Sequence, residues 1–286
     1  MITIQHLHFN YNSSSSEVFH DFSLNIADGK IVGLLGRNGT GKSTLLYLLT
    51  GLLRSTQGAI LVDDYNPQDR QPEMLQNIML VPEEIDLPAV KFKEFIKVNR
   101  VFYPNFSDEV LQQVLNDFQL PADIHLGALS MGQKKKVFMA FALATNTKYL
   151  LMDEPTNGLD IPSKAQFRTI AAQMNENRTI LMSTHQVHDV EQLIDHVVMI
   201  DGQSLMLDTS MSQLSQKVRF EQRPYGTPID DALYAEPSLT GTAVIVPAQG
   251  KEETPISLEL LFNALVQNPA LRHQLEDPEA NNTGFH

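Results

Sequence analysis

The segment GRNGTGKS, Gly36 to Ser43, constrains the fold of this chain more than any other part of the sequence. It matches the pattern G-x-x-x-x-G-K-[ST], in which backbone N–H groups of a glycine-rich loop surround phosphate groups. The pattern requires a preceding strand and a following helix, and the sequence predicts both. IVGLLG (31–36) is a continuous apolar run typical of a buried strand, and KSTLLYLLTGLL (42–53) has a helical pattern. A glycine-rich structural turn, the alternative, would leave the lysine and the hydroxyl unexplained.

This loop predicts a site for ATP and Mg²⁺. Lys42 would neutralise the β- and γ-phosphates, which makes it a catalytic as well as a binding residue, and the Ser43 hydroxyl would contact the metal ion. The glycines let the backbone approach phosphate oxygens because they have no Cβ. The predicted nucleotide-binding residues of this segment are Gly36, Arg37, Asn38, Gly39, Thr40, Gly41, Lys42, Ser43 and Thr44.

Two carboxylates follow a second apolar run, YLLMD (149–153). Asp153 stands at the end of the predicted strand, where it would hold Mg²⁺. Glu154 comes next, where it would orient or deprotonate an attacking water molecule. An acidic pair after an apolar strand is by itself more typical of a strand terminus. Together with the phosphate loop, it predicts a catalytic site.

A histidine ends a third apolar run, TILMSTH (179–185). Ligands of such sheets bind outside the carboxyl ends of the strands, so His185 is predicted to hydrogen-bond a γ-phosphate. His188 lies three residues later, but a metal site shared by the two histidines is disfavoured, because no further ligand signals lie nearby. We interpret the remaining histidines, including His6, His8, His20 and His196, as structural or solvent-exposed.

The segment LSMGQKKK (129–136) predicts the start of a helix. Ser130 and Gln133 have the spacing of a capping box, and apolar residues follow at helical intervals. Lys134, Lys135 and Lys136 then lie at the positive end of the helix dipole, where an anion would be favoured. This leaves two interpretations open, a capped surface helix with solvated lysines or a helix that awaits an anion.

The whole pattern predicts an α/β fold with a phosphate-loop ATPase core and a mixed, mainly parallel sheet. Residues 1–30 predict an antiparallel β part with a polar turn at NSSSS, and helices are expected from about residue 70 to 147. We assign residues 1–215 to an ATP-binding domain with a helical insert at about 84–147. Residues 216–286 are assigned to a small C-terminal α/β element of unknown role, in which KVRFEQ and TAVIVPA predict strands, SLELLFNALVQ predicts a helix, and the tail EDPEANNTGFH is expected to be frayed.

Composition excludes several classes of protein. The formal charge of −13 argues against broad binding to nucleic acid, which requires a basic face. The chain has no cysteine, so disulfides and thiolate metal sites are excluded. Neither a secretory signal nor a membrane-spanning apolar run is evident, so we expect a cytoplasmic protein.

The combination of these motifs resembles the ATP-binding subunits of ABC transporters. GRNGTGKS is similar to their Walker A loop, LLMDEP to Walker B, LSMGQ to the LSGGQ signature, NGLD to the D-loop and STH to the switch histidine. Their order and spacing match over roughly residues 1–215. A signature in a helical insert ahead of Walker B separates this family from other phosphate-loop ATPases.

The resemblance implies that two such domains pair head to tail, as a homodimer or a heterodimer. ATP would then lie between the Walker A loop of one domain and the signature of the other, where Ser130, Gly132 and Gln133 would act in trans. Asp160 resembles the D-loop aspartate of the same interface. Tyr11 resembles the aromatic residue that stacks on adenine, with Phe9 as the alternative, although a core position suits either aromatic equally well.

Two positions depart from the family pattern. Met131 replaces a glycine of the signature, which leaves Ser130 and Gly132 in place. Glu83, in VPEE, stands where the family generally has the Q-loop glutamine. A carboxylate there would be a further candidate ligand for Mg²⁺, and it adds charge near the phosphates.

The resemblance therefore implies an ATPase that powers a membrane transporter through a separate permease, with the helical insert as the docking face. Such a subunit would be peripheral at the inner face of the cell membrane when the permease is bound. The alternative is a soluble regulatory or repair ATPase of the same superfamily. A nucleotide-binding module without catalysis is disfavoured, because Lys42, Ser43, Asp153, Glu154 and His185 are all present. The substrate and the direction of transport remain open.

Overall fold

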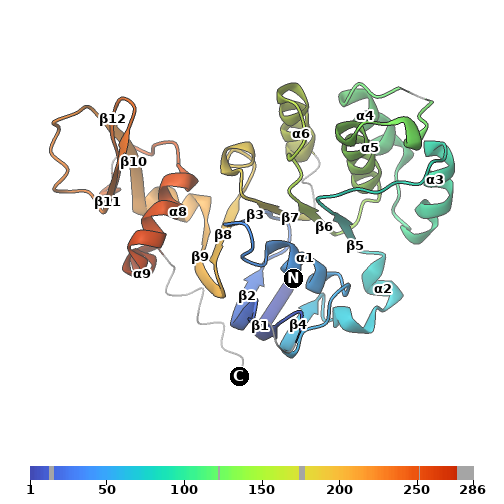
Figure 1. The fold of residues 1–286 in the computed structure, drawn as a ribbon, viewed down its shortest axis with the longest axis horizontal. Helices are drawn as coiled ribbons and strands as arrows, with labels where there is room; N and C mark the ends of the chain where they lie inside the picture. The colour runs from blue at the N-terminus through green and yellow to red at the C-terminus, as the bar shows by residue number, and fades with distance from the viewer. Residues whose placement is uncertain (13–15, 122, 174–177, 251, 276–286) are drawn as a thin grey trace.

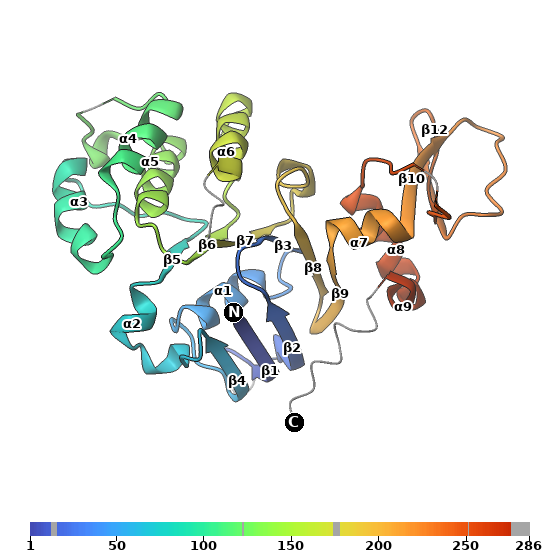
Figure 2. The ribbon, with the colours of Figure 1, turned by 180° about the vertical axis from the view of Figure 1, so that it is seen from behind.

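The computed structural model describes residues 1–12, 16–121, 123–173, 178–250 and 252–275. The centre of the expected turn at NSSSS and the C-terminal tail lie outside these ranges. Figures 1 and 2 show an elongated molecule, with a helical lobe and a C-terminal element at opposite ends of a central sheet. None of the described helices is both long enough and apolar enough to cross a membrane.

The central sheet has six strands. In spatial order these are β5 (Ile78–Val81), β6 (Tyr149–Asp153), β7 (Thr179–Thr184), β3 (Ile31–Gly36), β8 (His196–Asp201) and β9 (Ser204–Ser210). Neighbouring strands are parallel except for β8 and β9, which form an antiparallel pair. Every residue of β3, β6 and β7 is buried, as expected of parallel strands covered on both faces. The mixed, mainly parallel sheet predicted from the sequence is therefore confirmed.

A second, antiparallel sheet lies beside the first, with α1 (Lys42–Leu49) between them (Figure 1). Its strands are β2 (Phe19–Ile26), β1 (Ile2–Phe9) and β4 (Gln57–Val62), in that spatial order. Leucines 45, 46, 48 and 49 of α1 share one hydrophobic cluster with the inward residues of both sheets. This packing fixes the start of α1 at the carboxyl end of β3. A short helix, α2 (Pro72–Leu75), leads from this sheet to β5.

The helical lobe consists of α3 (Phe92–Asn99), α4 (Asp108–Asp117) and α5 (Met131–Ala144), and α6 (Ile161–Gln173) lies beside it. Ser107 caps α4 through a 3.1 Å hydrogen bond from the Val110 amide. Aromatic side chains hold the lobe together, for example Phe95 and Phe141 at 5.2 Å between ring centroids. The expectation of helices alone between residues 70 and 147 was wrong at β5, because a four-residue apolar run has no readable period.

Helix α7 (Met211–Lys217) spans the expected start of the C-terminal element at residue 216, and an antiparallel sheet and two further helices follow it. The sheet contains β10 (Val218–Arg223), β12 (Gly241–Pro247) and β11 (Tyr234–Ser238), and the helices are α8 (Leu258–Gln267) and α9 (Arg272–Leu275). The predicted strands and helix correspond to β10, β12 and α8. Buried residues of α8 belong to the same hydrophobic cluster as those of the central sheet, so the element packs firmly on the core.

Short 3-10 helices complete the described structure. They are η1 (Pro67–Asp69), η2 (Arg100–Phe102), η3 (Leu126–Ala128), η4 (Val187–Asp189) and η5 (Pro269–Leu271).

Candidate active site

The phosphate loop connects the end of β3 to the start of α1. Gly39 and Gly41 have φ angles of 82° and 95°, a region that other residues rarely adopt. A Cβ on Gly36 would lie 2.5 Å from the Ile200 carbonyl oxygen, so only glycine fits there. Gly41 precedes α1 without a side-chain cap, and the first turn of α1 carries no acidic residue. The N–H groups at this helix start are therefore suited to an anion.

The Lys42 side chain folds back over the loop. Its Nζ donates hydrogen bonds to the carbonyl oxygens of Gly36, at 2.8 Å, and Arg37, at 3.0 Å. Burial lowers the pKa of Lys42, while the nearby carboxylates of Glu154, Asp153 and Glu83 act in the opposite direction. A phosphate group would replace the two carbonyls as the partner of this ammonium group.

Glu154 is positioned by the end of the adjacent strand β7. Its Oε1 accepts hydrogen bonds from the His185 amide at 3.0 Å and from His185 Nδ1 at 2.7 Å, and its Oε2 accepts one from the Thr184 hydroxyl at 3.1 Å. The backbone of Glu154 has a φ of 46°, which turns the side chain sharply out of the strand direction. The carboxylate is thus held in one place, and His185 contacts it directly.

Asp153 lies beneath Glu154 and is 1% exposed. The Ser183 hydroxyl donates a hydrogen bond to its Oδ1, and the Glu154 amide donates to the Ser183 carbonyl at 3.0 Å. Sequence reasoning missed Ser183 and Thr184 as positioning residues. The signal was present, because both precede His185 at the end of a strand that pairs with β6.

A cavity of about 380 Å³ brings these groups together. Asp153 does not line it, and neither do Ser130, Gly132 and Gln133. Arg37 and Thr40 of the loop point elsewhere; the Thr40 hydroxyl donates to the Arg37 carbonyl at 2.9 Å. The residues that line the cavity are Tyr11, Val18, Asn38, Gly39, Gly41, Lys42, Ser43, Thr44, Glu83, Glu154 and His185.

Two predicted residues occupy the rim of this cavity. Tyr11 is 56% exposed, and a 2.8 Å hydrogen bond joins its hydroxyl to that of Thr44. Phe9, the alternative for adenine, is 4% exposed and packs in the core, so it is not available to a ligand. Glu83 follows β5, and its Oε1 accepts a 2.9 Å hydrogen bond from the Asn157 side chain. The Q-loop position is therefore linked to the segment that precedes Asp160.

The capping box at the start of α5 is confirmed. Ser130 Oγ accepts from the Gln133 amide at 3.3 Å, and Gln133 Oε1 accepts from the Ser130 amide at 3.0 Å. The interpretation of the lysines as a solvated run was wrong at Lys135, which is 5% exposed. Its Nζ donates to the carbonyls of Glu154 at 2.6 Å and Asn157 at 3.0 Å, because α5 packs against the loop that follows β6. Lys135 therefore connects the start of α5 to the loop after β6 within one chain.

The remaining predicted residues have structural partners. Asp160 Oδ1 accepts from the Ser163 amide at 2.9 Å, and hydrogen bonds from Ser163 lower the Asp160 pKa. His188 Nε2 pairs with Glu259 Oε2 of α8 at 2.8 Å.

The site chemistry fits ATP and Mg²⁺. An uncapped helix start, a buried ammonium group, the Ser43 hydroxyl and a fixed carboxylate all line the cavity. Ser43 and Glu83 bring to it oxygen atoms of the kind that Mg²⁺ prefers, whereas the buried Asp153 carboxylate lies outside the lining.

Comparison with known proteins gives consistent matches. The profile of the ABC transporter family matches residues 19–157. The chain is 27% identical over 272 residues to the ABC transporter ATP-binding protein YtrB of Bacillus subtilis, covering 87% of this chain and 93% of YtrB. It is 32% identical over 216 residues to the ABC transporter ATP-binding protein NatA of Bacillus subtilis, covering 72% of this chain and 87% of NatA.

A similar fold is found in a dimeric structure of an ATP-binding cassette bound to ADP and Pi, described as a post-hydrolysis state. The TM-score is 0.65 at 22% identity, over 74% of this chain and 99% of that chain. The likeness shows a shared fold.

Proposed function

Because the chain belongs to the family of ABC transporter ATP-binding proteins and is an ATPase of that family, we propose how its residues bind ATP, hydrolyse it and couple it to transport. The observation that carries the proposal is the meeting of Lys42 and Glu154 in one cavity, with the Glu154 carboxylate held by His185 and Thr184. The phosphate-binding group and the candidate general base are thereby available to the same ligand.

In the proposed reaction, the ATP phosphates bind the N–H groups at the start of α1. Lys42 Nζ gives up its hydrogen bonds to the carbonyl oxygens of Gly36 and Arg37 and binds the β- and γ-phosphates instead. Tyr11, at the rim of the cavity, contacts the adenine. Ser43 and Asp153 would hold Mg²⁺, with Glu83 as a further candidate ligand, and the ion would reduce the negative charge of the phosphates.

Hydrolysis then depends on Glu154. Its carboxylate orients the attacking water molecule and accepts its proton, because it is already fixed at the mouth of the cavity. His185 keeps that carboxylate in place and lies close enough to the cavity to donate toward the γ-phosphate. We propose that His185 is thus a positioning residue for Glu154 as well as a phosphate contact.

The second half of the site comes from another ATP-binding domain in this proposal. Ser130, Gly132 and Gln133 do not line the cavity of their own chain, whereas Met131 is 75% exposed at the start of α5. A partner domain would bring its α5 helix start to the γ-phosphate, with Asp160 at the same interface. Gly132 suits such a contact and also the close approach of the Gly158 carbonyl, which would lie 3.2 Å from a Cβ at Gly132.

Glu83→Gln is expected to keep ATP binding and to change permease-stimulated ATP turnover by about fivefold. A charged acceptor contributes about 1 kcal/mol more to a hydrogen bond than a neutral one, and Glu83 accepts from Asn157 beside the D-loop. The measurement is ATPase activity with and without the permease in lipid nanodiscs. Glu84→Gln, the adjacent exposed residue, is the control, and equal stimulated turnover in mutant and parent would count against a special role for Glu83.

The permease is proposed to dock in an apolar groove between the core and the helical lobe. The groove has a volume of about 980 Å³, and its occupant is an apolar cytoplasmic helix of the permease. Val101 and Phe102 are 72% and 65% exposed at its edge, too apolar to face water without a partner. Its wall includes Tyr47, Leu52, Leu75, Met79, Phe95 and Phe138.

Phe102→Asp is expected to weaken binding to the permease by roughly 30-fold, because loss of an aromatic anchor from an interface costs about 2 kcal/mol. Leu239→Asp, at an exposed turn of the C-terminal element, is the matched control. Co-purification from detergent-solubilised membranes measures the effect, with basal ATPase activity unchanged in both variants. If the two variants retained the same membrane protein equally, the groove would not be the docking surface.

The same co-purification separates transport from the soluble regulatory or repair alternative, since only a transporter subunit requires an integral membrane partner. The proposal places the chain in the cytoplasm, at the inner face of the membrane when docked.

Residues 1–215 form the ATP-binding domain in this proposal, and residues 216–286 form an accessory element. That element is joined to the segment after His185 through the His188–Glu259 pair and a 2.6 Å hydrogen bond from the Leu258 amide to Glu191.

A further inference from the structure

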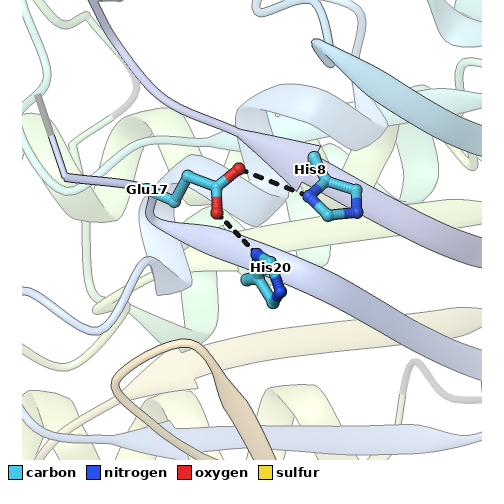
Figure 3. Close-up of side chains that lie close together, drawn as sticks. All are labelled: His8, Glu17 and His20. Atoms are coloured by element: carbon cyan, nitrogen blue, oxygen red, sulfur yellow. Dashed lines mark hydrogen bonds and ion pairs between the residues drawn. The ribbon is translucent and has the colours of Figure 1, made fainter. Parts of the chain in front are cut away.

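Three side chains outside the ATPase machinery converge on the hairpin formed by β1 and β2. His8 lies on β1, His20 lies on β2, and Glu17 lies two residues before β2 (Figure 3). Glu17 Oε1 accepts from His8 Nδ1 at 3.3 Å, and Glu17 Oε2 accepts from His20 Nδ1 at 2.6 Å. The two imidazole rings meet edge to face, with centroids 4.9 Å apart.

A strand irregularity helps to create this arrangement. Phe9 pairs with Phe19, so the next residues, His8 and His20, are cross-strand neighbours on one face. The register then shifts before Leu7 pairs with Phe22, and Asp21 has a φ of 51° in the extra position. The shift lets Phe19 and Phe22 both stay buried while His20 faces outward beside His8.

The backbone of Glu17 is fixed on both sides. Its carbonyl accepts from the Gln203 side chain at 2.6 Å, and the Val18 amide donates to the Phe9 carbonyl at 2.7 Å. Both oxygens of its carboxylate contact the imidazole rings of His8 and His20. The carboxylate is therefore held beside both rings.

The geometry approaches that of a tetrahedral metal centre. One ligand atom from each residue lies within 4.8 Å of the other two. Ligand atoms around a tetrahedral Zn²⁺, with bonds of about 2.0–2.1 Å, are about 3.4 Å apart. The side chain of His20 is 61% exposed, so its adjustment to that separation would not require movement of the core.

We propose that His8, Glu17 and His20 form a binding site for a divalent transition metal ion of the zinc class. Two imidazoles and one carboxylate are the ligand set of open three-ligand zinc sites, with water in the fourth position. Imidazole ligands favour Zn²⁺ over Mg²⁺, so this site does not compete for the magnesium of the ATPase reaction. It adjoins the nucleotide cavity, because Val18 follows Glu17 and lines that cavity.

Zinc binding to the full chain is measured by isothermal titration calorimetry with ZnCl₂ at pH 7.5, without nucleotide, because ATP binds zinc itself. We expect one zinc ion per chain at this site. Glu17→Gln and His20→Ala should each weaken its binding at least about tenfold, the lower limit for disturbing a metal's ligand environment.

Control variants show whether the measured zinc binding arises at His8, Glu17 and His20 or elsewhere on the chain. On the same hairpin, His6 Nδ1 lies 2.6 Å from Asp21 Oδ1, and no third ligand among the described residues joins this pair. The His6→Ala variant removes the pair and should retain full zinc affinity. His188→Ala tests the pair with Glu259 in the same way. Circular dichroism melting shows whether each variant folds, and the exposed His20 position is chosen because its loss leaves the core intact. Absence of zinc binding in the parent, or equal binding in His20→Ala and His6→Ala, would overturn the proposal.

Discussion

Replacing Glu154 with glutamine is expected to lower the ATPase rate by about 10²–10⁴-fold while ATP binding is retained. The amide has the size of the carboxylate and still offers an oxygen to His185, whose Nδ1 lies 2.7 Å from Glu154 Oε1 in the parent. It cannot accept a proton from water. Lys42 and the glycine loop, which bind the phosphates, are unchanged, so the loss should appear in kcat rather than in nucleotide affinity.

The measurement combines steady-state ATP hydrolysis with fluorescent nucleotide binding. Glu109→Gln, on the exposed side of α4, makes the same charge change away from the cavity and should leave both quantities unchanged. A Glu154→Gln protein that hydrolysed ATP at the parental rate would show that another group activates the water. A protein that no longer bound ATP would instead assign Glu154 a role in holding the nucleotide.

The central sheet and the phosphate loop could be predicted because their physical signals are local. The apolar runs of β3, β6 and β7 are long enough to be recognised, and each ends at a residue whose type fits a phosphate or metal site. Strand β5 was missed because four residues show no period, and β11 because YAEPS has few apolar residues and contains a proline.

Side-chain partners from distant segments could not be predicted. The sequence shows three consecutive lysines, but only the packing of α5 against the loop after β6 buries Lys135 and leaves its neighbours more accessible. Nor does the sequence separate Phe9 from Tyr11, since both are aromatic residues near a strand end. Their difference arises because Phe9 faces into the sheet packing and Tyr11 lies beyond the last strand residue.

The histidine cluster illustrates the same limit. The sequence favours a structural or solvent-exposed interpretation of His8 and His20, because their approach depends on the pairing of β1 with β2 and on one shifted register. Glu17 gives no motif signal either. Only the three-dimensional pairing brings two imidazoles to one carboxylate. Zinc titration therefore tests whether these histidines have only a structural role.

Replacing Ser130 with aspartate is expected to abolish ATP-dependent dimerisation of the Glu154→Gln protein and, in the parent background, to lower ATP turnover by about 10²–10³-fold, the effect of losing one transition-state donor. Aspartate caps a helix as well as serine does, so the cap on the Gln133 amide, now 3.3 Å from Ser130 Oγ, should survive. Its negative charge, however, would face the γ-phosphate bound by the partner domain.

Light scattering with and without MgATP measures the oligomeric state, and melting temperature reports on the cap. Ser130→Ala is the matched variant, since it removes the cap at a cost of about 1 kcal/mol but adds no charge. If Ser130 served only as a helix cap, the aspartate variant would dimerise like the parent and the alanine variant would be the less stable protein. If Ser130 acts in trans, the aspartate variant remains folded and monomeric, because its defect lies in repulsion of a phosphate that its own chain does not hold.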